Sequence, residues 1–190
     1  MYTLFLDTHD KEVIVALYKE MKLVNIVDKV SGYQHSQIAL PTIKSLLDEQ
    51  GITPKDLKEI IVVIGPGSFT GVRIAVTIAK AMAYALNIPL KTIDSLNIKA
   101  ISYDSDTDFY VSVLEKNGAY VGCFSKEGNK IGEYAYYSKS EYKKFLEENE
   151  VKEVEEIDYE KLIVYMNNQE AIPVHAVKPL YIKRIEVLKK

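Results

Sequence analysis

The sequence is poor in side chains that build disulfides and metal sites, with one cysteine and three histidines among 190 residues. A single cysteine, Cys123, excludes an internal disulfide and leaves no cysteine pair for a zinc site. The histidines are His9, His35 and His175, and their spacing is not that of metal ligands. We therefore expect no metal site, and we expect Cys123 to be a small core residue.

A signal peptide and a long apolar run are also missing. Residues 1–7 have neither the basic start nor the extended apolar stretch of a signal peptide. The most apolar segment, 72–86, is too short to cross a bilayer and carries Arg73 and Lys80. These features predict a cytoplasmic protein with no membrane contact.

An excess of positive charge is missing as well. The formal net charge is −3, acidic residues dominate segment 141–161, and the basic segment 178–190 is short. Neither segment approaches the basic stripe of a protein that grips nucleic acid by itself. Both are typical of solvated, charged surface.

The apolar segments that are present follow an order typical of an α/β protein. Three strands with short polar turns at 2–7, 12–18 and 23–30 predict an antiparallel meander. A run at 59–64 that is apolar throughout predicts a strand at the centre of the sheet. The other expected elements are helices at 35–50, 71–86, 95–103, 140–148 and 159–168, a short turn at 53–56, and strands at 90–93, 109–115, 119–125, 130–137 and 151–157. The order of strands and helices repeats along the chain, and the second copy is smaller. Two α/β units of this kind that face each other are typical of the actin-like architecture.

Residues 65–73, GPGSFTGVR, join the central strand to the second long helix and suggest a phosphate site. A P-loop has a lysine directly after its last glycine, but no lysine follows Gly71 before Lys80. The dinucleotide pattern G-x-G-x-x-G also fails, because an extra residue separates Gly67 from Gly71. Anion binding at the helix N-terminus stays open as an alternative. The residues favour a strand-to-helix corner whose glycines supply conformations denied to other residues.

Two further polar residues are candidates for chemistry. Asp7 ends the first strand, where kinases of this architecture hold magnesium and nucleotide, but aspartate also commonly caps a turn. The capping role is the favoured interpretation. His35 opens the first helix and has no identifiable partner for work as a general base, so we expect it to cap or to pack.

The string GPGSFTGVRI at 65–74, followed by AKA at 79–81, resembles the TsaB (YeaZ) family. This is the glycopeptidase-like subunit of the bacterial machinery that makes threonylcarbamoyladenosine in tRNA. Asp7-Thr8, HSQ at 35–37 and PLYIKR at 179–184 agree with it. The resemblance spans the chain and is strongest before residue 95. It departs from the family in a shorter second lobe and at His9, where the family usually has serine.

The resemblance implies an α/β, actin-like fold of two lobes, with residues 1–97 as the first lobe and 98–190 as a reduced second lobe. It also implies similarity to TsaD, the partner that catalyses threonylcarbamoyl transfer. TsaD carries metal-binding histidines just after the segment corresponding to Pro89-Leu90, and this sequence has none there. The expected role is therefore a non-catalytic scaffold, not an enzyme, that binds and supports a TsaD-like transferase.

The implied partners are a TsaD-like catalytic subunit and a TsaE-like ATPase, with tRNA reached only through the complex. A homodimer is the alternative when the partner is absent. No cofactor is expected in the chain alone, and the interface of the assembled complex is the one place where nucleotide binding stays open.

In this family the first helix and the helix after the glycines form the face that contacts the partner. Ala75, Ala79 and Ala83 recur every four residues, and this alanine ridge is expected to let a partner approach closely. The expected interface residues are His35, Ile38, Thr42, Gly71, Val72, Arg73, Ala75, Val76, Ala79, Met82 and Ala83. The corner, called the glycine loop below, consists of Gly65, Pro66, Gly67, Ser68, Phe69 and Thr70.

Two other functions compete with the scaffold. An ATP-binding phosphotransferase of the actin-like superfamily is suggested by the element order, Asp7 and the glycine loop. Peptidase activity follows from the family's older name, but the sequence has no identifiable nucleophile and base pair.

Overall fold

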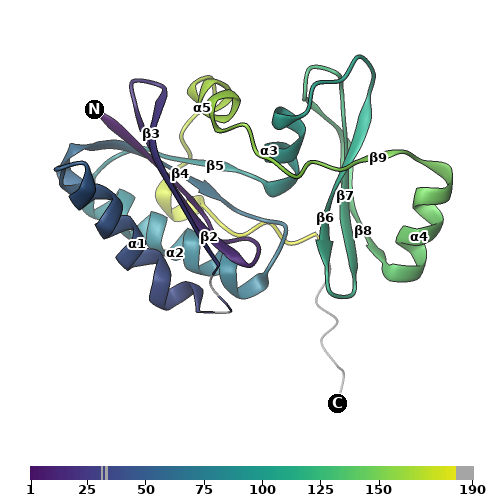
Figure 1. The fold of residues 1–190 in the computed structure, drawn as a ribbon, viewed down its shortest axis with the longest axis horizontal. Coiled ribbons are helices and arrows are strands. Elements are labelled where there is room, and N and C mark those ends of the chain that lie inside the picture. The colour runs from purple at the N-terminus through teal and green to yellow at the C-terminus, as the bar shows by residue number, and fades with distance from the viewer. Residues whose placement is uncertain (31, 33, 183–190) are drawn as a thin grey trace.

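The structure is a computed structural model that describes residues 1–30, 32 and 34–182. It has two lobes, each built around one sheet with helices beside it (Figure 1). Lys183 and Arg184 of the segment 179–184 lie outside the described residues.

The first lobe is built on a five-stranded sheet. Its strands are β1 (Tyr2–Asp7), β2 (Glu12–Lys19), β3 (Lys22–Val30), β4 (Leu57–Val63) and β5 (Leu90–Ile93), in the order β3-β2-β1-β4-β5. β1, β2 and β3 form the predicted antiparallel meander, whereas β4 runs parallel to both β1 and β5. The apolar strand β4 therefore lies inside the sheet, as its sequence predicts.

Helices cover both faces of this sheet. α1 (His35–Glu49) and α2 (Phe69–Leu86) lie on one face, and α3 (Ser95–Ser102) and α5 (Tyr159–Asn167) lie on the other (Figure 1). Alternate residues of a strand point to opposite faces. Ile60 and Val62 of β4 accordingly pack with α1 and α2, whereas Ile61 and Val63 pack with α3 and α5. All four side chains are fully buried, so β4 belongs to two cores at once.

The second lobe repeats this order on a smaller scale. Its strands are β6 (Phe109–Glu115), β7 (Gly118–Phe124), β8 (Lys130–Ser138) and β9 (Val151–Lys152), in the order β8-β7-β6-β9. β6, β7 and β8 are an antiparallel meander, and β9 pairs parallel to β6. α4 (Lys139–Glu148) packs along β7 and β8. The predicted α/β fold with a reduced second lobe is confirmed.

The chain returns to the first lobe after β9. Met166 of α5 is buried in the first-lobe core. Beyond α5, past the 3₁₀ turn η2 (Val174–Ala176), the Leu180 N–H donates to the Ile64 carbonyl at 2.7 Å. α5 and the C-terminal segment thus lie against the first lobe, whereas the prediction from the sequence counts all of residues 98–190 as the second lobe. The boundary at residue 97 stays a prediction.

Several element boundaries differ by one or two residues from the sequence-based expectation, and one strand is much shorter than expected. α2 begins at Phe69 rather than Gly71, because the Ser68 side chain caps it by accepting the Gly71 N–H at 3.2 Å. The strand expected at 151–157 is limited to Val151–Lys152. The short turn expected at 53–56 is the 3₁₀ turn η1 (Pro54–Asp56).

Candidate functional site: the glycine loop and the helix groove

The glycine loop packs directly against the turn that follows β1. A side chain added at Gly71 would overlap the carbonyl oxygen of Thr8, and one added at Gly67 would overlap the carbonyl oxygen of His9. Gly65 has a φ of +90°, a conformation that favours glycine. The glycines are therefore required by two close backbone approaches and one backbone conformation.

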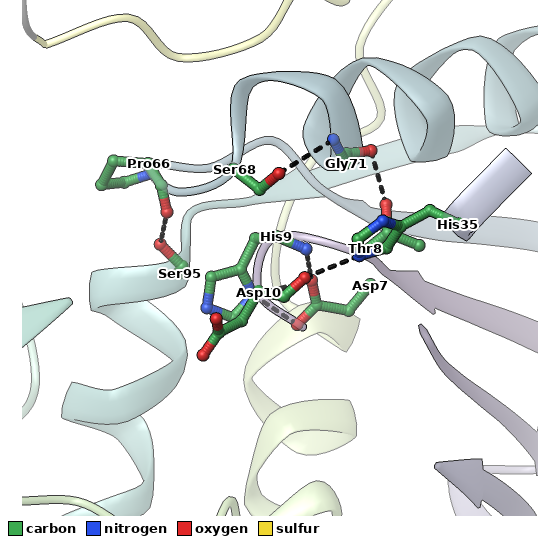
Figure 2. Close-up of polar contacts among 9 residues, drawn as sticks. All are labelled: Asp7, Thr8, His9, Asp10, His35, Pro66, Ser68, Gly71 and Ser95. Carbon is green, nitrogen blue, oxygen red and sulfur yellow. Dashed lines mark hydrogen bonds and ion pairs between the residues drawn. The ribbon is translucent and has the colours of Figure 1, made fainter. Parts of the chain in front are cut away.

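Hydrogen bonds fix this contact on both sides of the loop. The Ser68 N–H donates to the His9 carbonyl at 2.6 Å, and the Thr8 hydroxyl donates to the Gly71 carbonyl at 2.6 Å. Toward the second lobe, the Ser95 hydroxyl at the start of α3 donates to the Pro66 carbonyl at 2.5 Å. Figure 2 shows the loop held between the β1–β2 turn and α3.

This geometry makes three backbone N–H groups at the loop and the start of α2 unavailable to a phosphate. A phosphate cradle needs backbone N–H groups that point into open space. Here the N–H groups of Ser68, Gly71 and Val72 are all used within the chain, by the His9 carbonyl, the Ser68 hydroxyl and the Ser68 carbonyl. The loop is a corner that leads from β4 into α2, as the residues favour.

Asp7 and His9 form a close pair beside this corner (Figure 2). The His9 Nδ1 lies 2.7 and 2.8 Å from the two carboxylate oxygens of Asp7, and the His9 N–H donates to the same carboxylate at 2.8 Å. Burial lowers the pKa of His9, but the negative charge of Asp7, the hydrogen bond with it and the charge of Asp10 outweigh burial, so the pKa is raised overall. The Asp7 carboxylate thus caps the turn, which is the role that the sequence favours.

The cleft between the lobes is lined by Asp7, His9, Glu12, Lys99 and Glu155, among others. Its volume is about 160 Å³. Pockets for small-molecule ligands usually measure about 300–1,000 Å³. The cleft is therefore small for a nucleotide, and Asp7, one of the two aspartates that line it, is already engaged by His9. These observations give no support to the phosphotransferase alternative.

The outer faces of α1 and α2 form an apolar groove, called the helix groove here. It consists of two adjacent hollows of about 460 and 480 Å³ that share Leu40. Leu40 is 53% exposed and Phe69 is 44% exposed. The other apolar residues along it include Ile43, Ile74, Met82 and Leu86. An exposed apolar surface of this kind is typical of a protein interaction site.

The alanine ridge does not face this groove. Ala75, Ala79 and Ala83 are at most 1% exposed and share a core with β1 and β4. Their small side chains let α2 approach the sheet of its own chain, so their burial gives no support to a contact with a partner, and that contact stays a prediction. Burial within the chain likewise removes five other predicted interface residues from the surface: His35, Thr42, Gly71, Val72 and Val76.

Arg73 and Met82 are the predicted interface residues that line the helix groove, whereas Ile38 packs half-buried against the first-lobe core. Sequence reasoning missed Leu40 and Ile74. In the sequence, the exposed outer face of α2 is indicated by a row of residues at helical spacing on the side opposite the alanines. The exposed members of that row are Thr70, Arg73, Thr77, Ala81 and Tyr84.

α2 is 18 residues long, and its mean hydropathy of 1.3 meets a length and composition criterion for a membrane span. One such helix is weak evidence, because a helix that packs on the core of a protein meets the same criterion. α2 packs along β4 and β1 on one side. Its remaining apolar surface is the surface that forms the helix groove.

His35 takes the packing role expected for it. It is 3% exposed, and its Nε2 lies 2.7 Å from the Asp10 carbonyl oxygen, which joins the start of α1 to the β1–β2 turn. Within the described part of the chain, no three His, Cys, Asp or Glu side chains are placed to share a metal ion.

Comparison with known proteins gives sequence similarity over about half of the chain. Residues 23–113 match the family described as TsaD, tRNA N6-adenosine threonylcarbamoyltransferase. The chain is 39% identical over 100 residues to the tRNA threonylcarbamoyladenosine biosynthesis protein TsaB of Bacillus subtilis, covering 53% of this chain and 44% of that protein. It is 32% identical over 96 residues to TsaB of Escherichia coli K12, covering 50% and 41%. The chain thus spans less than half the length of these two relatives.

Similarity of fold extends over almost the whole chain. A crystal structure of a Pseudomonas aeruginosa protein with similarity to peptidase YeaZ superposes with a TM-score of 0.79 and 22% identity, covering 96% of this chain and 99% of that chain. At this identity the likeness concerns the fold alone. The predicted α/β fold of two lobes and the predicted resemblance to the TsaB family are both confirmed.

Proposed function

We propose that this chain, a relative of the TsaB proteins, is a non-catalytic subunit that binds a TsaD-like transferase and supports the formation of threonylcarbamoyladenosine in tRNA. Two relatives are named tRNA threonylcarbamoyladenosine biosynthesis protein TsaB. The part of the chain that matches the transferase family, residues 23–113, contains α1, the glycine loop and α2.

The helix groove is the observation that carries the proposal. Leu40 of α1 and Phe69 of α2 line this groove and are 53% and 44% exposed. Large apolar side chains gathered on one face lose contact with water when a partner covers them, which favours association. Both helices pack on the sheet, α2 through the buried alanine ridge and α1 through apolar residues such as Ile43 and Leu46, so the surface is presented without rearrangement.

The rest of the chain supports a non-catalytic role. The Asp7 carboxylate is held by His9, and the N–H groups of Ser68, Gly71 and Val72, at the end of the loop and the start of α2, are used within the chain. We propose that the chain has no cofactor of its own and that nucleotide binds only where the chain meets the transferase. The same proposal places the chain in the cytoplasm, in a complex that includes a TsaE-like ATPase, and it reaches tRNA only through that complex. A homodimer through the same groove is the proposed state when the transferase is absent.

The test is association with the cognate transferase, measured by titration calorimetry and by size-exclusion chromatography with light scattering. The wild-type chain is expected to form a stable complex and to increase threonylcarbamoyl transfer by the transferase. Leu40→Asp places a charge in the middle of the helix groove and is expected to weaken the affinity by about tenfold or more.

Leu146→Asp is the matched control. Leu146 is also a leucine on a helix and is 46% exposed, but it lies on α4 of the second lobe. This variant is expected to bind as the wild type does. The proposal fails if the wild-type chain does not associate with the transferase and full transfer activity is reconstituted without it.

A further inference from the structure

Arg73 stands at one end of the helix groove. It lies in the second turn of α2, is exposed, and lines the hollow that also contains Leu40, Phe69 and Ile74. The other residues that line this hollow are apolar or carry only a hydroxyl group, as Ser36, Thr70 and Thr77 do, so Arg73 brings a positive charge to the rim of an uncharged surface.

The guanidinium of Arg73 is held in place by two aromatic residues. Its central carbon lies 3.6 Å from the centroid of the Phe69 ring, and its Nε–H donates to the Tyr181 hydroxyl at 2.8 Å. The Phe69 and Tyr181 rings are themselves 5.5 Å apart. A guanidinium stacked on aromatic faces has a fixed plane.

Tyr181 reaches this place because the C-terminal segment is tied to the first lobe. The Leu180 N–H donates to the Ile64 carbonyl at 2.7 Å, and the Lys80 Nζ of α2 donates to the Val177 carbonyl at 2.9 Å. The arginine is therefore ordered in the free chain, and the entropy of fixing its side chain is not lost again on binding.

The charge of Arg73 is not compensated within the described part of the chain. None of the ion pairs there includes Arg73. With Nε bonded to Tyr181, the two terminal nitrogens of the guanidinium remain to donate to a ligand. The other end of the groove differs, since Lys44 there is paired with Asp48 of the same helix.

We infer that Arg73 selects the partner of the helix groove by binding a carboxylate presented on an otherwise apolar helix. This inference rests on the proposed function and names the chemistry of the surface that the transferase brings to the groove. Apolar side chains of such a helix fill the hollows beside Leu40 and Ile74, and an aspartate or glutamate near its end meets the guanidinium. A planar fork of N–H donors binds a carboxylate through two parallel hydrogen bonds. The apolar lining favours a protein helix over the hydrated phosphates of RNA.

The experiment measures affinity for the cognate transferase by titration calorimetry at two salt concentrations. Arg73→Gln is expected to weaken the affinity by about tenfold or more and to reduce its salt dependence. Arg73→Lys is expected to recover only part of that loss, because an ammonium does not form the planar, two-bond contact. Tyr181→Phe keeps the ring and removes the hydrogen bond that orients the guanidinium, so a smaller loss of about threefold is expected.

Lys143→Gln, at an exposed lysine of α4 in the second lobe, removes an equal charge and is expected to leave the affinity unchanged. Charge reversal then identifies the partner residue: Arg73→Glu is rescued by changing one aspartate or glutamate of the transferase to arginine. If the wild-type chain binds but Arg73→Gln binds equally well, the inference is wrong and the proposed function stands. If Arg73→Gln instead loses only binding of tRNA to the complex, the ligand is a phosphate and the inference is also wrong. If the wild-type chain does not bind, the proposed function itself has failed.

Discussion

The carbonyl oxygen of Thr8 occupies the place where a side chain on Gly71 would begin. The first turn of α2 and the turn after β1 are therefore joined backbone to backbone, with the Thr8 hydroxyl bonded to the Gly71 carbonyl at 2.6 Å. This contact sets the position of α2 on the sheet. Since the outer face of α2 lines the helix groove, the glycine serves the interaction surface indirectly, by placing the helix that carries it.

Gly71→Ala is expected to lower the free energy of unfolding by about 3 kcal/mol, because the added methyl group forces two backbone segments apart. Urea unfolding followed by circular dichroism measures the change. Gly51→Ala is the control, since Gly51 has a φ of +65° but open space around it. Only the backbone strain of about 1 kcal/mol is expected there. Equal losses in the two variants would contradict the role assigned to the close contact.

The order of the helices and strands could be predicted from the sequence because each element has a clear local pattern of apolar and polar residues. β4 has an uninterrupted apolar run and lies inside the sheet, while the short polar turns of 2–30 gave the meander. The start of α2 was less readable. Ser68, Thr70 and Gly71 are all acceptable as the N-cap of a helix. In the structure Ser68 is the N-cap, and the hydrogen bond from its N–H to the His9 carbonyl, a tertiary contact, holds it there.

The alanine ridge shows why the interaction face was harder to predict. A row of small residues allows close approach, but the sequence does not say whether the approaching element belongs to the same chain. In the structure Ala75, Ala79 and Ala83 meet β1 and β4. The face opposite them, with Arg73 and Tyr84, is the exposed one. The pairing of Arg73 with Tyr181 joins positions 108 residues apart and had no local signal.

Ala79→Glu separates the two interpretations of the ridge. Ala79 is 1% exposed within the chain, so a glutamate there buries an unpaired charge and is expected to cost at least about 3 kcal/mol of folding stability. The variant should therefore unfold in less urea than the wild type, even without any partner. Ala81→Glu, on the exposed side of the same helix, is expected to change stability by less than about 0.5 kcal/mol. A stable Ala79→Glu chain that merely fails to associate would restore the original interface assignment.

The Asp7–His9 pair is expected to make stability depend on pH. The pKa of His9 is raised in the folded chain, so its ion pair with Asp7 contributes fully below the unfolded-state value of about 6.5. That contribution is lost as the pH rises through the raised folded-state value. The stability advantage of the wild type over His9→Asn should therefore shrink from about pH 6 toward higher pH.

Histidine signals in NMR spectra measure the cause of this dependence directly. Asp7→Asn removes the charge and the charged hydrogen bond but leaves the burial, so the pKa of His9 is expected to fall. Asp106→Asn, at an exposed position between α3 and β6, is expected to leave the His9 titration unchanged. An unchanged titration in Asp7→Asn would show that the pair does not control the charge of His9.

The two lobes are joined at Asp94, which lies just before α3 and accepts a hydrogen bond from the Asn97 N–H at 2.8 Å. Tyr134 of β8 donates its hydroxyl to both carboxylate oxygens, at 3.1 and 3.0 Å. Burial raises the pKa of Asp94, and the bonds from Asn97 and Tyr134 oppose that rise. Tyr134→Phe keeps the ring but removes its bond to the charged carboxylate. The pKa of Asp94 should then rise further.

The expected loss in Tyr134→Phe is about 2 kcal/mol at pH 7, where the unbonded carboxylate would remain charged in a buried place. The folded chain binds the Asp94 proton more tightly than the unfolded chain, so the cost of the buried charge is relieved as the pH falls through the raised value. The loss should consequently be smaller at about pH 4 than at pH 7. Urea unfolding at both pH values measures it, with Tyr84→Phe, an 81% exposed tyrosine, as the unaffected control. Equal losses at the two pH values would mean that the Tyr134 hydroxyl acts through packing, and that no charged hydrogen bond joins the lobes.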